Sequence, residues 1–128
     1  MTDKISDMLN RLKNAGAVAH ETTTVPYSSV NLAILEILTK NGFIGNFEKA
    51  KKGSKTIEVT LEYKNSKSKI RGVRRYSKPS RRIYKRVSEI RPVKNGYGIM
   101  VYSTPQGLKT DAEARKEKVG GEAMFSIW

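Results

Sequence analysis

The stretch SSVNLAILEILTKNGFI, residues 28–44, carries the strongest secondary-structure signal of the chain. Apolar side chains recur in it at the spacing of one helix face, at Val30, Ala33, Ile34, Ile37 and Leu38. Ser28 or Ser29 can cap the first turn, and Asn41-Gly42 favours a left-handed residue after the last. The stretch therefore predicts an amphipathic helix that leads directly into apolar Phe43 and Ile44.

Upstream of this helix, the sequence predicts a first helix and a short strand. The helix is indicated by apolar residues at helical spacing, namely Ile5, Met8, Leu9 and Leu12. The run from Thr22 to Tyr27 is rich in β-branched residues and contains Pro26, which favours an edge strand.

Downstream of it, residues 43–49 and 55–63 predict a β-hairpin. The second segment alternates apolar Ile57, Val59 and Leu61 with polar residues, which is the period of a half-buried strand. The turn would lie at Lys51-Lys52-Gly53-Ser54. The first half thus predicts helix, strand, helix and hairpin, in that order.

The second half predicts short strands joined by turns. Strands are expected at 71–76 and around Ile83-Tyr84, on either side of a Ser77-Lys78-Pro79-Ser80 turn. An Asn95-Gly96 turn leads to GIMVY at 98–102, which is apolar on both faces and therefore predicts a central strand.

The last part of the chain predicts a short helix and a closing strand. Thr110-Asp111-Ala112-Glu113 has the pattern of a capping box at a helix start. Gly120-Gly121 is expected to end that helix before a strand from Glu122 to Trp128.

The order of these elements predicts an α+β fold made of two different small subdomains packed together. The boundary is placed at Asn65-Ser66, where the charge composition changes abruptly. Residues 1–66 would form a helix-strand-helix-hairpin unit. Residues 67–128 would form a mainly β unit, with an antiparallel sheet and a short helix.

Basic residues are concentrated in one segment, 64–94. It holds 13 of the 25 Lys and Arg residues and one acid, Glu89, so it contributes +12 of the net +13. Such a localised charge predicts a polyanionic partner, with nucleic acid as the first candidate and an anionic membrane surface as the second. A solvated face would be the simpler explanation of an ordinary charge run. Here, apolar residues spread through the segment indicate a folded surface.

Two groups of side chains have chemistry suited to RNA. Five arginines lie between Arg71 and Arg82, with Tyr76 and Tyr84 close to them, which suits phosphate binding and base stacking. The simpler alternative for the tyrosines is half-buried strand packing. The loop Ser103-Thr104-Pro105-Gln106-Gly107 offers hydroxyls and an amide that can read a base edge, unless these residues serve the turn alone.

The composition gives little support for an enzyme or a metal protein. The chain has no cysteine, which suits the cytoplasm, and His20 is its only histidine. The sequence has no signal-peptide pattern and no apolar run of the ~20 residues that span a bilayer. We therefore expect no catalysis, cofactor, metal, small-molecule substrate or membrane contact.

Seven blocks of sequence occur in the order and at the spacing of a known family. They read DMLNRLKNA at 7–15, NGFI at 41–44, SKPSRRIY at 77–84, GYGI at 96–99, ST at 103–104, TDAEAR at 110–115 and VGGE at 119–122. In these blocks the chain resembles the bacterial small-subunit ribosomal protein eight family from end to end. The resemblance implies two α+β subdomains that bind the central domain of small-subunit (16S) rRNA and help assemble the small subunit, without catalysis.

The resemblance also implies which residues contact RNA. By position in the blocks these are Ser103, Thr104, Gly107, Gly121 and Glu122, with Tyr84 and Lys85 on the neighbouring surface. Gln106 belongs to the same loop, and the basic segment adds phosphate contacts at Arg82, Arg81 and Lys78. The start of the second helix, at Ser28, corresponds to a secondary RNA contact.

The chain departs from the family in two places. Pro105 stands where the family has serine and Gln106 where it has lysine, so one hydroxyl and one phosphate-binding charge are missing. The segment Pro26-Tyr27-Ser28-Ser29-Val30-Asn31 lacks two of the family's positive charges at the secondary contact.

The expected partners follow from this resemblance. They are the small-subunit rRNA, neighbouring small-subunit proteins, with ribosomal protein five among them, and the mRNA of the chain's own operon. The free chain is expected to be a monomer in the cytoplasm. Two other functions compete with the structural role: a free regulator that represses an mRNA, and an RNA-processing enzyme.

Overall fold

The most strongly predicted helix is α2, Ser29–Lys40, in a computed structural model that describes residues 4–49, 55–78, 80–93 and 96–128. Ser28 is its N-cap, because the Ser28 hydroxyl accepts a hydrogen bond from the Asn31 amide (3.0 Å). Gly42 supplies the left-handed residue after its end, with φ +81°. One part of the predicted stripe is wrong: Val30 is 41% exposed, whereas Asn31 is fully buried and donates to the Pro26 carbonyl oxygen (2.9 Å).

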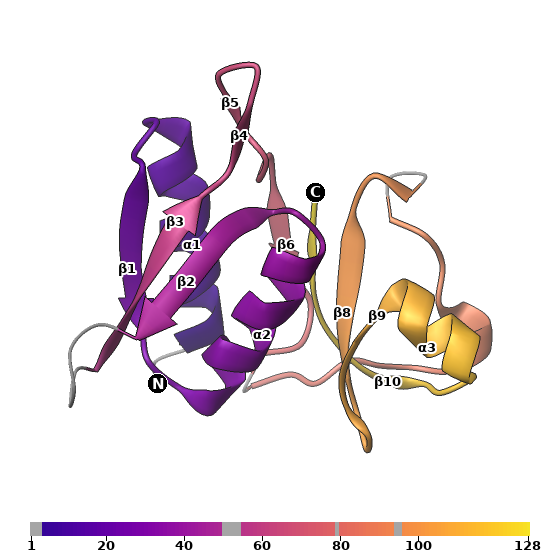
Figure 1. The fold of residues 1–128 in the computed structure, drawn as a ribbon. Coiled ribbons are helices and arrows are strands. Elements are labelled where there is room, and N and C mark those ends of the chain that lie inside the picture. The colour runs from indigo at the N-terminus through magenta and orange to yellow at the C-terminus, as the bar shows by residue number, and fades with distance from the viewer. Residues whose placement is uncertain (1–3, 50–54, 79, 94–95) are drawn as a thin grey trace. The chain divides into compact units, whose positions relative to one another are not determined.

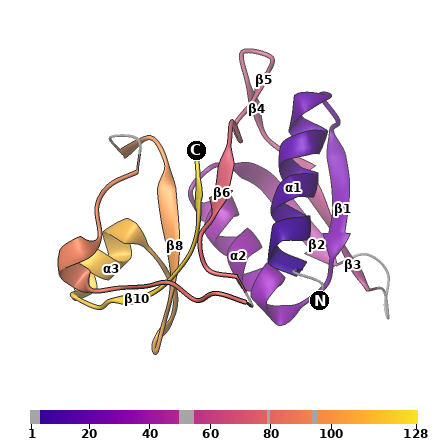
Figure 2. The same ribbon diagram turned by 180° about the vertical axis from the view of Figure 1, so that it is seen from behind.

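The contacts divide the chain into two compact units, Met1–Arg71 and Gly72–Trp128. The first begins with α1 (Lys4–Ala17), β1 (Thr22–Pro26), α2, β2 (Ile44–Lys49) and β3 (Thr56–Leu61). The strands form an antiparallel sheet in the order β1-β3-β2, so β1 is an edge strand as predicted. The two helices cover one face of this sheet (Figures 1 and 2). The predicted turn at 51–54 lies outside the described residues.

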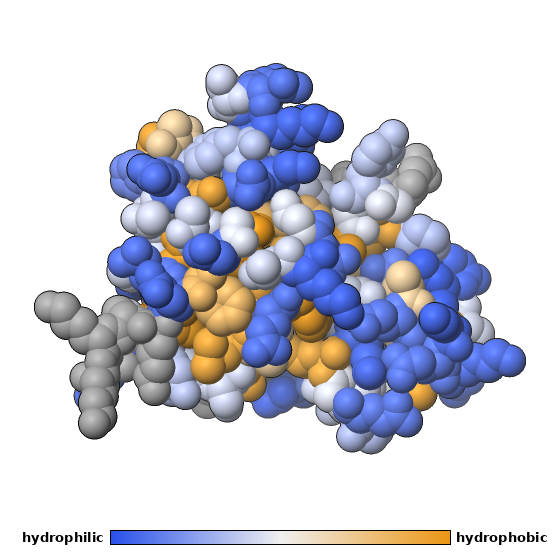
Figure 3. All heavy atoms as spheres, in the orientation of Figure 1, coloured by the Kyte–Doolittle hydropathy of each residue, from blue (hydrophilic) through white to orange (hydrophobic). Residues whose placement is uncertain are grey.

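A short hairpin that the sequence does not predict closes the first unit. β4 (Tyr63–Lys64) and β5 (Lys67–Ser68) pair through a turn at Asn65-Ser66. The hairpin stands beyond the three-stranded sheet at the top of Figure 1, and the atoms drawn there in Figure 3 are mainly hydrophilic. The division between the two units falls after Arg71, so the paired strands β4 and β5 both belong to the first unit. The boundary placed at Asn65-Ser66 stays a prediction about folding units.

The second unit is built around its last strand. Its elements are β6 (Val73–Arg75), β7 (Tyr84–Lys85), the 3₁₀-helix η1 (Val87–Glu89), β8 (Ile99–Thr104), β9 (Gly107–Thr110), α3 (Asp111–Glu117) and β10 (Gly121–Ile127). The antiparallel sheet has the order β6-β10-β8-β9, and β7 also pairs with β10. β8, which contains most of the GIMVY run, is an inner strand as predicted. The predicted α+β class is confirmed.

Two local predictions about this unit are wrong. The capping box opens α3 as expected, but the helix ends at Glu117 and not at Gly120-Gly121, and its C-cap Lys118 takes the left-handed conformation (φ 55°, ψ 45°). Gly121 instead allows two strands to approach, because a Cβ there would collide with the Ser103 carbonyl oxygen. Residues 103–107 are not an open loop but the tip of the β8–β9 hairpin, with Pro105 and Gln106 between the strands. Pro79 and Asn95 of the predicted turns lie outside the described residues.

The core of the second unit lies between its sheet and α3. A buried cluster of Ile90, Tyr102, Ala114 and Ala123 is surrounded by the partly buried Tyr76, Ile83, Met100 and Val119. Burial raises the pKa of Tyr102 to about 12, and the negative charge of Asp111 adds to the shift. Asp111 is itself fixed, because its Oδ1 accepts from the Met100 amide (3.1 Å) and its Oδ2 pairs with Arg115 (3.0 Å).

Candidate nucleic-acid interface

Strand register brings three predicted site residues into one row across β7, β10 and β8. Glu122 lies opposite Tyr84 on one side and opposite Ser103 on the other. Directly opposite residues of antiparallel strands point to the same face of a sheet. The side chains of Tyr84, Glu122 and Ser103 therefore share a face, and we call these three residues the outer row.

The neighbouring residue on each strand belongs to the core. Ala123 lies opposite Tyr102, and the Ala123 amide donates to the Ile83 carbonyl oxygen (2.8 Å). Ile83, Ala123 and Tyr102, which we call the inner row, pack into the cluster that includes Ala114 of α3. Because side chains alternate along a strand, the inner row fixes the outer row from the opposite face of the sheet.

Ser103 and Thr104, two neighbouring hydroxyl residues near the tip of the β8–β9 hairpin, differ in their hydrogen bonds. The Thr104 hydroxyl donates to the Gly107 carbonyl oxygen (2.7 Å) and accepts from the Gln106 amide (3.1 Å). Gly107 has φ +107°, a conformation that favours glycine. The half-buried Ser103 has a hydroxyl with no hydrogen-bond partner among the described residues, and Gln106 is exposed. Thr104 thus serves the turn, whereas Ser103 and Gln106 remain available to a partner.

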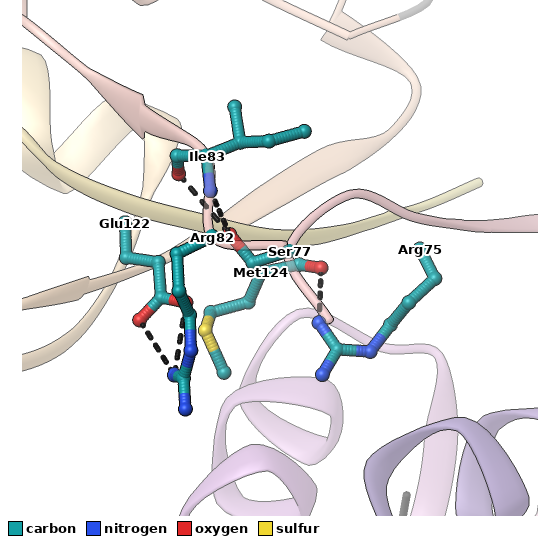
Figure 4. A network of polar contacts seen from close by, with 6 residues as sticks. All are labelled: Arg75, Ser77, Arg82, Ile83, Glu122 and Met124. Carbon is teal, nitrogen blue, oxygen red and sulfur yellow. Dashed lines mark hydrogen bonds and ion pairs between the residues drawn. The ribbon is translucent and has the colours of Figure 1, made fainter. Parts of the chain in front are cut away.

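The basic loop that precedes β7 is closed by a buried serine. The Ser77 hydroxyl accepts from the Ile83 amide (2.8 Å) and donates to the Ile83 carbonyl oxygen (3.1 Å) (Figure 4). Inside this closure the backbones of Lys78 and Arg81 exchange two hydrogen bonds (2.8 and 3.0 Å). Lys78, Arg81 and Arg82 are exposed on the closed loop. Ser77 therefore positions three basic side chains, a role that sequence reasoning missed because a serine at a turn is common.

Arg82 and Glu122 form an ion pair that links the basic loop to the outer row. Arg82 Nη1 lies 3.1 Å from Glu122 Oε2 and 3.4 Å from Oε1 (Figure 4). The Glu122 side chain is only 11% exposed, whereas that of Arg82 is 57% exposed. A guanidinium has five N–H donors, so donors remain on Arg82 for a phosphate. The structure thus gives Glu122 a partner within the chain and makes it a support for Arg82.

Several other arginines of the basic segment also have partners in the protein. Arg75 Nη1 donates to the Met124 carbonyl oxygen (2.6 Å), and Arg91 Nη1 donates to that of Ser88 (2.7 Å). The Arg74 guanidinium lies over the ring of Tyr76, 5.0 Å from its centroid. These contacts place part of the positive charge at fixed points on the surface.

The two tyrosines of the basic segment differ in exposure. Tyr76 is partly buried and packs against the core cluster, which is the simpler of its two alternatives. Tyr84 is 70% exposed in the outer row, so its ring is open to a stacking partner.

The structure gathers most of the predicted site at one end of the second unit's sheet. Pairing of β7, β10 and β8 brings together the loop arginines and the residues Tyr84, Lys85, Ser103, Thr104, Gln106, Gly107, Gly121 and Glu122. Lys85 is half-buried opposite Gly121. Ser28 belongs to the first unit, where its hydroxyl caps α2.

The described residues offer no obvious alternative chemistry. No three His, Cys, Asp or Glu side chains among them gather into a metal-binding group. None of the helices in the described ranges is long and apolar enough to cross a membrane. A closed basic loop beside an exposed aromatic ring and an available hydroxyl is an arrangement suited to a nucleic-acid partner. The fold and site define a basic α+β protein of the RNA-binding class.

Comparison with known proteins gives the family. Residues 3–128 match the family described as Ribosomal protein S8, and the chain belongs to this family. The family is one of structural ribosomal proteins. The sequence resemblance to the small-subunit ribosomal protein eight family is therefore confirmed.

The relatives are similar over their full length. The chain is 46% identical to the small ribosomal subunit protein uS8 of Mycoplasmopsis pulmonis (strain UAB CTIP), over 100% of this chain and 98% of the relative. It is 44% identical to the protein of the same name from Syntrophus aciditrophicus (strain SB), again over 100% and 98%. The protein from Clostridium kluyveri is 45% identical over the same shares.

Proposed function

We propose that the chain is a structural protein of the small ribosomal subunit that binds the central domain of 16S rRNA and helps the subunit assemble. One observation supports this proposal above the rest: strand register joins the outer row to the closed basic loop in a chain of this family. Arg82, Arg81 and Lys78 would hold phosphates. Ser103 and Gln106 would read a base edge, and Tyr84 would stack on an exposed base.

We propose different roles for residues that the resemblance groups together. Ser103 and Gln106 are the candidates for direct contact, because their polar groups are available. Thr104, Gly107 and Gly121 would act through the backbone, by shaping the hairpin and letting β8 approach β10. Glu122 would contribute through Arg82. Lys85 and Ser28 would add a neighbouring phosphate contact and a secondary contact on the first unit.

Narrower parts of this proposal concern partners and place. The chain would act in the cytoplasm as part of the ribosome, without catalysis, and would be a monomer when free. Ribosomal protein five is proposed as a neighbour in the subunit. The chain's own operon mRNA is proposed as a second ligand, because a transcript that copied the rRNA site would fit the same residues.

Sedimentation tests the structural role. We expect the chain in a cell lysate to comigrate with the small ribosomal subunit on a sucrose gradient and to stay there after a wash at moderate salt. Sedimentation as free protein or with mRNA alone would contradict a permanent ribosomal role. Incubation of the pure chain with labelled RNA and a divalent metal tests the absence of catalysis, since any turnover would support an RNA-processing enzyme.

A further inference from the structure

The β4–β5 hairpin and the three residues after it carry the part of the basic segment that belongs to the first unit. Residues 64–71 contain four bases and no acid, whereas residues 1–63 contain eight bases and seven acids. Lys64, Lys67, Lys69 and Arg71 are all exposed. Because the contacts divide the chain after Arg71, this +4 segment belongs to the first unit, whereas the loop closed by Ser77 belongs to the second.

The turn of the hairpin holds two lysines side by side. Asn65 and Ser66 both have positive φ, 53° and 64°, which is the pattern of a tight type I′ turn. Lys64 lies directly opposite Lys67 in the ladder. Like charges in opposite positions repel each other across a β-ladder. The fold therefore keeps two positive charges together, and a phosphate between them would relieve the repulsion.

The base of the hairpin is anchored to the rest of the first unit. The Tyr63 hydroxyl donates to the His20 carbonyl oxygen, and the Ser68 hydroxyl accepts from the amide of buried Ile70 (3.1 Å). Gly16 of α1 lies so close to Ser68 that a Cβ there would collide with the serine side chain. The tip lysines thus stand on a fixed support, which lowers the entropy cost of binding.

The chemistry of the tip favours phosphate over a protein surface. Its four residues, Lys64 to Lys67, are all polar and exposed, with no apolar or aromatic anchor. Protein interfaces are depleted in lysine and depend on buried aromatic or arginine anchors. Lys64, Lys67, Lys69 and Arg71 also form no ion pair with another described residue. Two available cations at the hairpin tip, followed by the exposed Lys69 and Arg71, suit the backbone of a nucleic acid.

We propose that the β4–β5 hairpin is a second RNA-binding element, in which Lys64 and Lys67 hold phosphates of the small-subunit rRNA and Lys69 and Arg71 extend the contact. The inference rests on the proposed function and adds a site to it. This element binds backbone and reads no base. It therefore contributes to affinity for any RNA that reaches it, in a salt-dependent way.

A pair of matched double variants tests this site. Lys64→Gln with Lys67→Gln removes the tip charges, whereas Lys13→Gln with Lys40→Gln removes two exposed charges from α1 and α2 of the same unit. Binding to a central-domain rRNA fragment is measured from 50 to 200 mM salt. The tip variant should bind about tenfold more weakly, and the slope of log affinity against log salt should fall in magnitude by about 1 to 2. The control should change either quantity much less.

A tethered probe locates the contact independently of affinity. The chain has no cysteine, so Ser66→Cys and Gln106→Cys each give a single attachment point for an iron chelate that cleaves nearby RNA. We expect cleavage of the rRNA fragment from both positions. A thermal melt equal to that of the wild type shows that Ser66→Cys keeps the fold.

The outcomes separate this inference from the proposed function. Wild-type preference for the central-domain fragment over a scrambled RNA tests the proposed function, and its absence contradicts both proposals. If the preference is present but the tip variant behaves like its control, the hairpin site is wrong and the proposed function stands. Absence of RNA cleavage from position 66, with cleavage from position 106, leads to the same conclusion.

Discussion

The residues of the outer and inner rows of the second unit are neighbours in sequence, yet the two rows lie on opposite faces of the sheet. Tyr84, Glu122 and Ser103 share the face of the sheet that we propose for RNA binding, either by direct contact or, for Glu122, through Arg82. Ile83, Ala123 and Tyr102 pack toward α3. The difference follows from the two-residue period of a strand, which sends neighbouring side chains to opposite faces. Recognition and stability are therefore adjacent in sequence but separable by substitution.

Overfilling the inner row should have the largest effect, and it should act on stability alone. Ala123 is fully buried, so Ala123→Leu adds three carbons without space and should lower the free energy of unfolding by about 3 kcal/mol. The exposed Ala112→Leu on α3 is the control and should change it little. Urea unfolding measures both. Equal stability of the two variants would contradict the packing of the inner row.

Removing the available hydroxyl of the outer row should act on binding alone. Ser103→Ala should lower affinity for the central-domain rRNA by ~1 to 3 kcal/mol and spare binding to scrambled RNA, as expected for a group that reads a base. Its unfolding free energy should change by less than about 0.5 kcal/mol. Ser88→Ala removes another exposed hydroxyl and serves as the control. An equal loss on both RNAs would refute the assignment of Ser103 to base reading.

Thr104 should contribute mainly to the stability of the β8–β9 hairpin. Thr104→Ala removes both hydrogen bonds of the turn and should lower the unfolding free energy by about 1 kcal/mol. It should weaken RNA binding only as far as the hairpin loosens. Thr104→Ser keeps the hydroxyl and should restore most of both quantities. If Thr104→Ala loses cognate affinity while its stability is unchanged, Thr104 reads RNA directly.

Arg82 should affect the salt dependence of binding more than its specificity. Arg82→Ala should weaken binding to all RNAs alike and lower the salt slope by about 1, because one phosphate contact is lost. Arg82→Lys keeps the charge and should keep the slope, although it loses the guanidinium Nη1 that contacts both carboxylate oxygens of Glu122. An unchanged slope in Arg82→Ala would mean that the ion pair with Glu122 is the only task of this side chain.

Tyr102→Phe should have the smallest effect of these substitutions on stability at neutral pH and a measurable effect at alkaline pH. Its pKa is raised from 10.0 to about 12, so between these values the unfolded chain loses a proton that the folded chain keeps. Stability should therefore fall as the pH rises above about 10, by on the order of 1 kcal/mol per pH unit. Tyr102→Phe should lack this part of the decline. Parallel stability curves of the two proteins from pH 9 to 11 would contradict the burial of the hydroxyl.

The elements with local signals were predictable from sequence. The Ser28 cap, the capping box at Thr110 and, apart from Val30, the apolar stripe of α2 depend on residues close together in sequence, and they are found where expected. The alternation of apolar and polar residues in β3 likewise predicted which side chains of this strand are buried. Local hydrogen bonds and periodicity decide these elements, so a single sequence is enough to locate them.

The features that depend on distant residues were not predictable in the same way. Asn31 is buried in the first turn of α2, where its side-chain NH2 group donates to the Pro26 carbonyl oxygen, and no periodicity signals that. Lys118 takes a left-handed conformation although two glycines follow it. The role of Ser77 depends on the return of the chain at Ile83.

The candidate site was likewise only partly predictable from the sequence. Its basic and polar residues were identified from charge and from the family blocks. The outer row became visible only when the register of β7, β10 and β8 was known, and so did the pairing of Arg82 with Glu122. The contrast between Ser103 and Thr104 depends on hydrogen bonds at the hairpin tip, which a sequence does not reveal.

The central claim is that charge holds the RNA while the outer row selects it. It is tested most directly by the ratio of affinities for the central-domain rRNA and for a scrambled RNA of equal length, measured for wild type, Ser103→Ala and Arg82→Ala at one salt concentration. We predict that the ratio falls at least fivefold in Ser103→Ala, as loss of ~1 kcal/mol or more of base discrimination requires, and stays unchanged in Arg82→Ala. A ratio that falls in Arg82→Ala and holds in Ser103→Ala would contradict the account.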